Sequence, residues 1–353
     1  MVISRTPFRI SFFGGGTDYP AWYRKHGGQV LATSINKYCY ITCRYLPPFF
    51  EHRTRIVYSK IENCQNLEDI QHPAVRETLR FLKLERGLEI HHDGDLPARS
   101  GMGSSSSFTV GFLNALYALL GTMPHKHRLA LESIHIEQEM IKETVGSQDQ
   151  MMAAYGGLNH LTFKTSGDIA IRAVTISQER LEELNSHLML FYTGIKRTAS
   201  DLAKTYVEDL DRKSDHLHAM QEMVDEAIAV LGSSRCICNF GELLHKTWML
   251  KRGLSAQVSN QVVDELYEQA REHGAMGGKI TGAGCCGFLL LFVPPSAQGR
   301  VRQALQGLLH VPFKFESSGT QIIFYEPGQE DYATLDKERS INSIQPFREL
   351  TTL

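Results

Sequence analysis

The sequence predicts an α+β fold divided into two domains. Its 353 residues are more than one typical hydrophobic core holds. Strand-like and helix-like segments follow one another without the strict strand–helix–strand alternation of a doubly wound sheet. A new strand starts at His187 after a β-rich stretch, so we place the boundary just before it. The first domain then covers residues 1–185 and the second covers residues 186–353.

The first domain opens with a strand. Residues 5–13 alternate in polarity and are rich in Phe and Ile, and the run Gly14–Gly16 ends them. Its other predicted strands cover residues 30–45, 55–59, 88–92, 158–163 and 169–176. Its predicted helices have apolar residues at helical spacing and cover residues 72–84, 104–120 and 127–142.

The second domain is predicted to be richer in helices. These helices cover residues 199–210, 216–231, 240–250, 260–273 and 299–309. The predicted strands cover residues 187–192, 279–281, 288–293, 312–316 and 321–325. The polar tail after Pro327 is left without a predicted structure.

Composition narrows the function classes. The formal net charge is -2 and there is no long basic run, which argues against a nucleic-acid-binding protein. No stretch approaches the roughly 20 apolar residues of a membrane span, and the opening segment does not resemble a signal peptide. The seven cysteines form no CxxC pair and are interpreted as free thiols of a reducing compartment. We therefore expect a cytoplasmic protein that binds neither nucleic acid nor membrane.

A glycine- and serine-rich loop runs directly into the predicted helix at 104–120. Its sequence, Leu96-Pro-Ala-Arg-Ser-Gly-Met-Gly-Ser-Ser-Ser-Ser107, lets the backbone approach a ligand closely. The first N–H groups of a helix are unpaired and its dipole favours an anion, so this pattern predicts a phosphate site. The serines could instead simply cap the helix, but one serine would suffice for that. The loop is neither a Walker A motif nor a dinucleotide-binding fingerprint.

Two carboxylates are candidates for chemistry. At about 100° per residue, Glu137 falls on the apolar face of its helix, whereas Glu139 falls on the opposite face. A buried carboxylate needs a cation, a metal or a structural ion pair as its partner. Asp149, in Gly146-Ser-Gln-Asp149, follows this helix and could return an acid to the same cleft.

Two further glycine runs are ambiguous by themselves. Gly14-Gly-Gly-Thr-Asp18 follows the first strand, and Lys279-Ile-Thr-Gly-Ala-Gly-Cys-Cys-Gly287 joins two strand-like pieces. Each could mark a close approach to a ligand or only a tight bend.

In combination, these segments resemble the three ordered motifs of the GHMP kinase superfamily, which is named for galactokinase, homoserine kinase, mevalonate kinase and phosphomevalonate kinase. Motif one is Pro7-Phe-Arg9-Ile with Gly-Gly-Thr-Asp18-Tyr, motif two is Pro97-x-x-x-Gly101-Met-Gly-Ser-Ser, and motif three is Lys279-Ile-Thr-Gly-Ala-Gly284. The resemblance implies an N-terminal domain like domain 2 of ribosomal protein S5, a ferredoxin-like C-terminal domain, and an active site between them.

The resemblance also implies ATP and Mg²⁺ as cofactors and assigns roles. Asp149 matches the aspartate that orients or deprotonates the accepting hydroxyl, and Arg9 matches a basic residue beside it. Asp18 matches a residue that binds sugar hydroxyls, with Gly16 and Thr17 next to it in the motif. Ser105 and Glu137 match the magnesium ligands. The nucleotide-binding residues implied by motif two are Pro97, Ser100, Gly101, Met102, Gly103, Ser104, Ser105 and Ser106.

Within the superfamily, Gly-Gly-Gly-Thr-Asp-Tyr-Pro20, His26-Gly-Gly28 and Thr193-Gly194-Ile-Lys-Arg197 resemble bacterial heptose 7-phosphate kinases. These phosphorylate the anomeric hydroxyl of D-glycero-D-manno-heptose 7-phosphate to the 1,7-bisphosphate. The product feeds nucleotide-activated heptose for surface polysaccharides such as lipopolysaccharide and capsule. Galactokinases carry Glu-His where this chain has Gly15-Gly16, which would leave room for a larger sugar. Cys285-Cys286 in motif three, and Ser106-Ser107 in motif two, also depart from the family's glycines and alanines.

Several alternatives stay open. A sugar phosphate needs a second group of cations, and we expect it at Lys196-Arg197, with Arg197 as the candidate, or at Lys251-Arg252. Both pairs could equally be solvated charges at helix ends. A fucokinase-like sugar 1-kinase acting on an unphosphorylated sugar, and a nucleotide-binding regulator without turnover, are the alternative functions. The oligomeric state is left open, with a homodimer as one alternative.

Overall fold

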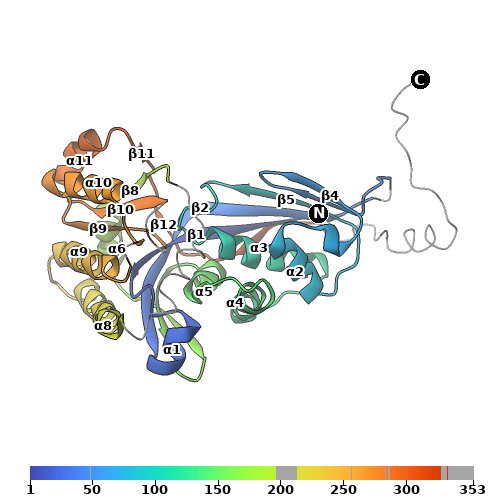
Figure 1. Cartoon of the computed structure of the whole chain (residues 1–353), viewed down its shortest axis with the longest axis horizontal. Coiled ribbons are helices and arrows are strands. Elements are labelled where there is room, and N and C mark those ends of the chain that lie inside the picture. The colour runs from blue at the N-terminus through green and yellow to red at the C-terminus, as the bar shows by residue number, and fades with distance from the viewer. Residues whose placement is uncertain are drawn as a thin grey trace.

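The computed structural model describes residues 1–47, 49–195, 213–255, 257–282, 284, 287–326 and 332. These residues form two β-sheets, each covered by helices, with the second sheet and its helices at one end of the molecule (Figure 1). The glycine-rich segments of motif two, in the first half, and motif three, in the second half, meet each other where the halves are in contact.

The first sheet is built on the long antiparallel pair β1 (Val2–Phe13) and β2 (Gly28–Tyr45). Nearly every residue of β1 is buried, because its sheet position places one face against helices and the other against the remaining chain. The strand order is β13-β1-β2-β5-β3-β4, with further strands joined to β2. The added strands are β3 (Thr54–Val57), β4 (Ile61–Cys64), β5 (Leu88–Gly94), β6 (Leu158–Phe163) and β7 (Ile169–Ala173).

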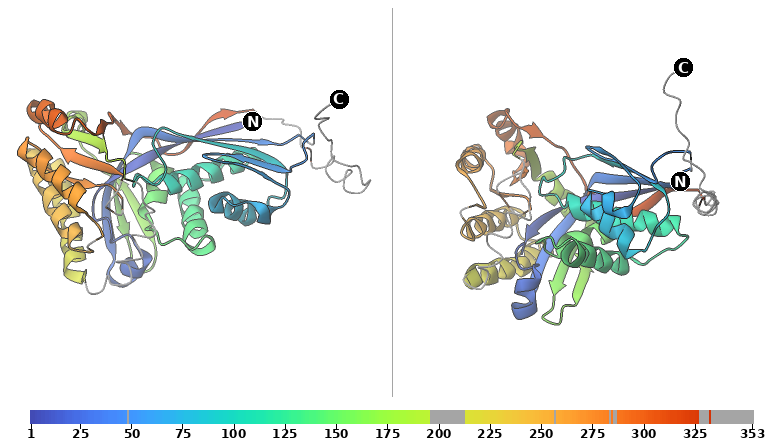
Figure 2. Two further views of the ribbon diagram at one scale, coloured as in Figure 1. Left: turned by 45° about the horizontal axis from the view of Figure 1, so that its top comes forward. Right: turned by 45° about the vertical axis from the view of Figure 1, so that its right-hand side comes forward.

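Helices cover this sheet (Figure 2). Several of them contain residues of the predicted site. The helices are α2 (Pro73–Phe81), α3 (Ser104–Leu119), α4 (Lys126–His135) and α5 (Gln148–Tyr155), and the short α1 (Pro20–His26) follows motif one. The predicted helix at 127–142 is not uniform. It continues beyond α4 as a π-helical segment, Ile136–Met140, and π segments of this kind are frequent at functional sites.

The second sheet is antiparallel, with the strand order β11-β8-β10-β9. Its strands are β8 (Leu188–Tyr192), β9 (Gly277–Ile280), β10 (Phe288–Phe292) and β11 (Leu309–His310). In chain order this is 4-1-3-2, with α8 (Ser214–Leu231), α9 (Cys238–Arg252) and α10 (Gln261–Glu272) before the second strand and α11 (Gln298–Ala304) before the fourth. That arrangement is the predicted ferredoxin-like pattern.

The end of the described chain returns to the first sheet. β12 (Phe315–Glu316) pairs with β2, and β13 (Gln321–Tyr325) pairs with β1. The predicted second domain, residues 186–353, includes these two strands, although both pair with strands of the first sheet. A single boundary along the chain cannot describe such a return, because strands pair by their proximity in the folded structure and not by their order in the sequence.

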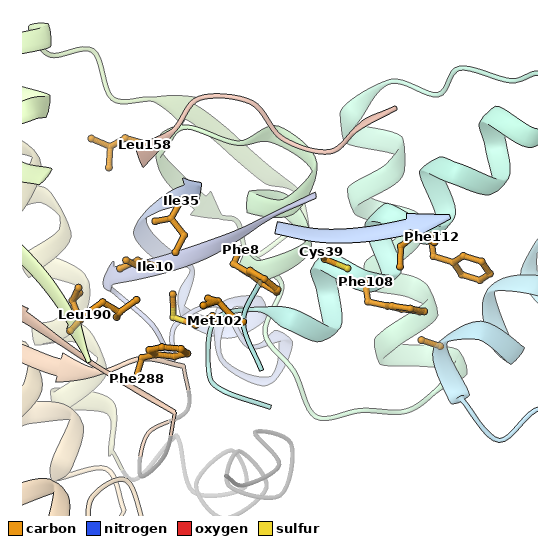
Figure 3. Packing of buried hydrophobic residues seen from close by; sticks show 14 of the residues in the cluster. Phe8, Ile10, Ile35, Cys39, Met102, Phe108, Phe112, Leu158, Leu190 and Phe288 are labelled. Carbon is orange, nitrogen blue, oxygen red and sulfur yellow. The ribbon is translucent and has the colours of Figure 1, made fainter. Parts of the chain in front are cut away.

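One hydrophobic core joins the two halves. Phe8 and Ile10 of β1 belong to the same buried cluster as Leu190 of β8 and Phe288 of β10 (Figure 3). Phe240 of α9 packs edge-on against Phe12 and Phe13, at ring-centroid distances of 5.4 and 5.0 Å. The end of β1 is therefore fixed against α9, and the glycine-rich part of motif one, Gly14–Asp18, follows directly after that contact.

The sequence prediction missed α1, β4, α5, α6 (Gln178–Ser186) and β11. These are short, and the apolar pattern of α5 is weak because it is buried nearly all round. His92 of β5 is half-buried and packs edge-on against Phe108 at 5.0 Å. No helix in the described part of the chain is long and apolar enough to cross a bilayer.

Candidate active site

The glycine-rich loop ends at the first turn of α3. Gly103 caps the helix with a left-handed backbone (φ 75°), and the four serines that follow differ in their hydrogen bonds and exposure. The Ser104 hydroxyl accepts from the Arg99 N–H at 3.3 Å, and Ser107 donates to the Pro7 carbonyl at 2.9 Å. Ser105 is exposed at the helix start, while Ser106 is buried. Unpaired N–H groups and one accessible hydroxyl therefore lie together at this helix end, as an anion site requires.

Motif three packs backbone to backbone against this loop. A Cβ built on Gly282 would lie 2.6 Å from the Gly101 Cα, and one built on Gly101 would lie 2.6 Å from the Thr281 carbonyl oxygen. Neither position has room for a side chain. The glycines of motif three therefore support the loop of motif two.

Arg9 and Asp149, which are 140 positions apart in the sequence, form a bidentate ion pair. The Arg9 Nε and Nη2 atoms donate to Asp149 Oδ1 and Oδ2, each at 2.7 Å. The remaining Arg9 nitrogen, Nη1, donates to the Gly101 carbonyl at 2.7 Å. Asp149 lies in the first turn of α5 and keeps 23% of its side chain exposed, against 6% for Arg9. The carboxylate is thus held in place beside the loop and still reachable by a reactant.

Asp18 is buried and held by two donors. The Gly16 N–H reaches its Oδ1 at 3.0 Å, and the Gln148 amide reaches its Oδ2 at 2.9 Å. Burial raises the pKa of Asp18, the Gly16 hydrogen bond opposes that rise, and the nearby Asp149 charge adds to it. Asp18 and Asp149 therefore belong to one electrostatic site.

Glu137 is fully buried in the π-helical segment, as the helical phase predicted, whereas Glu139 is exposed. Its Oε2 accepts from the Ser106 hydroxyl at 2.8 Å and from the Gln150 amide at 2.5 Å. Burial raises the pKa of Glu137 to about 7, and the hydroxyls of Thr109 and Ser106 and the Gln150 amide oppose that rise. Its other oxygen, Oε1, is buried and has no hydrogen-bond partner among the described residues.

These residues fit a magnesium ion. A buried carboxylate oxygen without a partner is what a cation would satisfy. Within the described residues, no group of three or more His, Cys, Asp or Glu could hold a metal. Mg²⁺ does not require one, since it is usually bound by one or two carboxylates together with substrate phosphates. Glu137 Oε1 and the exposed Ser105 hydroxyl are the protein atoms available for that role.

Two buried lysines of the second half complete the site. Lys279 of β9 donates to the Ser11 and Phe12 carbonyls of β1, at 2.8 and 3.0 Å. Lys251 of α9 donates to the Gly282 carbonyl of motif three. Burial lowers the pKa of Lys279 well below its usual range, and burial followed by the charge of Arg9 lowers the pKa of Lys251 to about 8.

Some predicted site residues have other partners. The Thr17 hydroxyl donates to the Gly14 and Gln29 carbonyls, so it fixes the turn of motif one. Met102 is fully buried between Phe8 and Phe288, so only its backbone faces the loop (Figure 3).

Pro97 is half-buried, and Ser100 is buried with no hydroxyl partner among the described residues. The predicted phosphate-binding residue Arg197 lies outside the described residues.

The room expected at the glycines of motif one is limited. A Cβ on Gly14 would lie 1.9 Å from the Gln29 carbonyl oxygen, and a Cβ on Gly16 would lie 3.2 Å from Leu217 of α8. A Cβ on Gly15 would meet only ordinary contacts, at 3.5 Å and beyond. Helix α8 therefore fills part of the space that the prediction reserved for a larger sugar.

Sequence reasoning missed the amides that hold the carboxylates. Gln148 and Gln150 flank Asp149, one bound to Asp18 and the other to Glu137. The sequence signal for them is the alternation Gln-Asp-Gln at the start of a helix. Consecutive helical residues point in different directions, so the two glutamines can reach different carboxylates on either side of Asp149.

Comparison with known proteins agrees with this geometry. Residues 70–157 match the model of the GHMP kinases N terminal domain, and residues 228–310 match that of the GHMP kinases C terminal domain. The first match contains the loop, Glu137 and Asp149, and the second contains Lys251 and all of motif three. The chain belongs to the GHMP kinase superfamily. A GHMP kinase is an ATP-dependent phosphotransferase, and this assignment confirms the family and the two-domain fold predicted from the motifs.

Individual relatives of this GHMP kinase have modest sequence identity to it. The chain is 29% identical to a D-glycero-alpha-D-manno-heptose 7-phosphate kinase of Campylobacter jejuni, over 90% of this chain and 97% of that protein. It is 25% identical to an L-fucokinase/L-fucose-1-P guanylyltransferase of Bacteroides fragilis, over 86% of this chain and 36% of that longer protein. A crystal structure of a D-glycero-D-manno-heptose 1-phosphate kinase from Bacteroides thetaiotaomicron has a TM-score of 0.75 and 23% identity, covering 92% of this chain and all of that one, and supports the fold alone.

Proposed function

We propose that this GHMP kinase transfers the γ-phosphoryl group of ATP to the anomeric hydroxyl of D-glycero-D-manno-heptose 7-phosphate. The product would be heptose 1,7-bisphosphate, a precursor of nucleotide-activated heptose for surface polysaccharides. The observation that supports the substrate is the similarity to the heptose kinase of Campylobacter jejuni, which extends along nearly the whole of both proteins. The observation that supports the reaction is the Arg9–Asp149 pair beside the phosphate loop.

In this mechanism Asp149 accepts the proton of the attacking hydroxyl. Its carboxylate is held at both oxygens by Arg9, which fixes its direction relative to the loop. A fixed carboxylate is an adequate base because the transition state of phosphoryl transfer is loose and little nucleophilic push is required. The hydroxyl oxygen bonds to the γ-phosphorus, the bond from that phosphorus to the bridging oxygen breaks, and ADP leaves with the electron pair.

The nucleotide phosphates lie at the start of α3 in the proposed complex. The N–H groups there and the Ser105 hydroxyl face the anion, while Ser104 closes the loop onto Arg99. Glu137 Oε1 and Ser105 would hold Mg²⁺, which supplies positive charge to the phosphate oxygens. Asp18, kept in place by Gln148, would accept hydrogen bonds from the sugar hydroxyls.

The experiment that tests this proposal is a coupled ADP-release assay with ATP and magnesium. The acceptors are heptose 7-phosphate, mannose 6-phosphate, mannose, galactose and fucose, with Asp149→Ala as the inactive control. Turnover on the heptose phosphate that the control lacks would support both acceptor and base. Turnover restricted to a free sugar would reject the heptose assignment and keep the kinase.

A fucokinase-like activity is the second candidate. It is favoured by the 25% identity to the fucokinase of Bacteroides fragilis, although the chain spans only about a third of that protein. The same panel separates the two, since fucose lacks the phosphate. Replacing Arg197 by Ala should raise the KM for the phosphosugar much more than the KM for ATP, and an equal effect on both would remove Arg197 from the substrate site.

A further inference from the structure

Lys251 is a buried cation whose position the reaction described above does not use. Only 4% of the residue is exposed, although it occupies the last turn of α9, where lysines usually reach into solvent. Its neighbour Arg252 behaves as expected for such a place, with 30% of its side chain exposed and an ion pair to Asp264 at 2.7 Å. The two adjacent cations therefore separate into one that faces the protein interior and one that faces outward.

Burying an ammonium group is costly unless it is compensated. Among the described residues, Lys251 uses one of its three donor hydrogens, on the Gly282 carbonyl. A single neutral carbonyl is a weak partner for a full charge. The position of Lys251 thus leaves donor capacity for an anion that the described residues do not supply.

The surroundings of Lys251 identify where that anion would lie. Gly282 packs directly on Gly101, and the Gly101 carbonyl accepts from Arg9 at 2.7 Å. The charges of Arg9, Asp18 and Asp149 all act on the Lys251 ammonium. Lys251 is therefore next to the tip of the phosphate loop and to the Arg9–Asp149 pair.

We propose that the Lys251 ammonium binds the oxygens of the transferring phosphoryl group, as a second cation opposite Arg9. In the step it assists, the acceptor oxygen bonds to the γ-phosphorus, the bond to the bridging oxygen of ATP breaks, and the acceptor proton passes to Asp149. Lys251 keeps its own protons throughout and acts through charge. This inference rests on the kinase activity of the superfamily and is independent of which sugar is the acceptor.

A phosphate elsewhere on the acceptor is the alternative source of the same chemistry. A phosphate at the far end of a sugar would lie several bonds from the accepting hydroxyl, whereas Lys251 is grouped with the residues at that hydroxyl. Kinetic constants separate the two: a contact made only during transfer changes kcat, and a contact made with the bound substrate changes KM.

Three variants test the assignment. Lys251→Met removes the charge and the donor. Lys251→Gln removes the charge but keeps an N–H donor for the Gly282 carbonyl, so it isolates the charge from support of motif three. Lys246→Met removes an exposed lysine of the same helix and is the matched control.

We expect both Lys251 variants to lower kcat by about 10²–10³-fold on whichever acceptor the wild type uses, as for the loss of one preorganised charge contact. The KM values should change by less than about threefold in this case of purely transition-state binding. Lys246→Met should stay close to wild type. Recovery of kcat in Lys251→Gln would overturn the proposal, because a hydrogen bond to motif three would then account for the effect of Lys251 on the rate. A raised KM for a phosphorylated acceptor alone, with kcat kept, would overturn it in favour of the distal phosphate.

A binding measurement makes the test independent of turnover. ADP with aluminium fluoride and magnesium mimics the transferring group, and its affinity is compared by calorimetry with that of ADP and magnesium. Lys251→Gln should weaken the first complex by at least about tenfold, since one good charge contact is worth about that factor, and should leave the second unchanged. Equal affinities of wild type and variant for the aluminium fluoride complex would refute the proposal, even if no sugar in the panel were phosphorylated.

Discussion

Removing the Ser106 hydroxyl should weaken metal binding at Glu137. This hydroxyl is one of two donors to Glu137 Oε2, at 2.8 Å, and both donors lie in a region from which solvent is excluded. A hydrogen bond to an ionised group contributes about 1.5–3 kcal/mol. Because the metal binds the ionised carboxylate, Ser106→Ala should reduce its affinity about 10- to 100-fold, at 1.4 kcal/mol per factor of ten.

The pH dependence of metal binding gives a second, linked expectation. The pKa of Glu137 is raised to about 7, so the proton competes with the metal below that pH and affinity should rise as pH increases through it. Ser106 favours the charged form, hence its removal should shift this midpoint upward by about 1–2 pH units, at 1.36 kcal/mol per unit.

The assay is a manganese titration in the presence of ADP, followed by electron paramagnetic resonance between pH 6 and 9, which needs no turnover. Ser107→Ala is the control, because Ser107 is equally buried and adjacent but donates to the Pro7 carbonyl. If the two variants showed the same metal affinity and the same pH midpoint, the assignment of Ser106 as a support for Glu137 would be refuted.

Three further outcomes are expected. Glu137→Gln should stabilise the metal-free protein at pH 8. A carboxyl pKa raised from 4.5 to about 7 on folding gives stability that is present below pH 4.5 and is lost as the pH rises through 7. The free energy of unfolding should therefore increase by about 3 kcal/mol, at 1.36 kcal/mol per pH unit, and equal urea midpoints for both proteins at pH 8 would contradict this expectation. Gly282→Ala should raise the KM for ATP about tenfold through displacement of Gly101, given about 1–3 kcal/mol of backbone strain, and an unchanged nucleotide titration would count against that contact. Asp149→Asn should lower kcat by about 10²–10⁴-fold while ATP affinity is kept, and activity near wild type would exclude Asp149 as the base.

Local sequence patterns predicted much of the fold and part of the site. The burial of Glu137 followed from helical phase alone, and the glycine-serine loop at the start of α3 followed from spacing and residue type. Both depend on neighbours along the chain, where geometry is fixed by the period of the helix. The family assignment required the order of three motifs, which no single motif could provide.

Long-range contacts were beyond the same reasoning. The approach of Arg9 to Asp149 depends on how β1 and α5 pack, and the burial of Lys251 depends on how the second half closes on the first. In the sequence, Lys251 and Arg252 are equivalent cations at a helix end. Only the tertiary structure shows that one faces the site and the other faces Asp264.

The return of β13 to the edge of β1 constrains the order of events during synthesis. Val2 pairs with Tyr325, so the outermost strand of the first sheet emerges from the ribosome more than 300 residues after its partner. The strands of the second sheet, from Leu188 to His310, all lie between them. That sheet has all its strands while β1 still has an open edge, and such edges recruit strands from other chains. Nascent chains that stop short of β13 should therefore be held soluble by chaperones or aggregate, even though every motif of the active site has already been made.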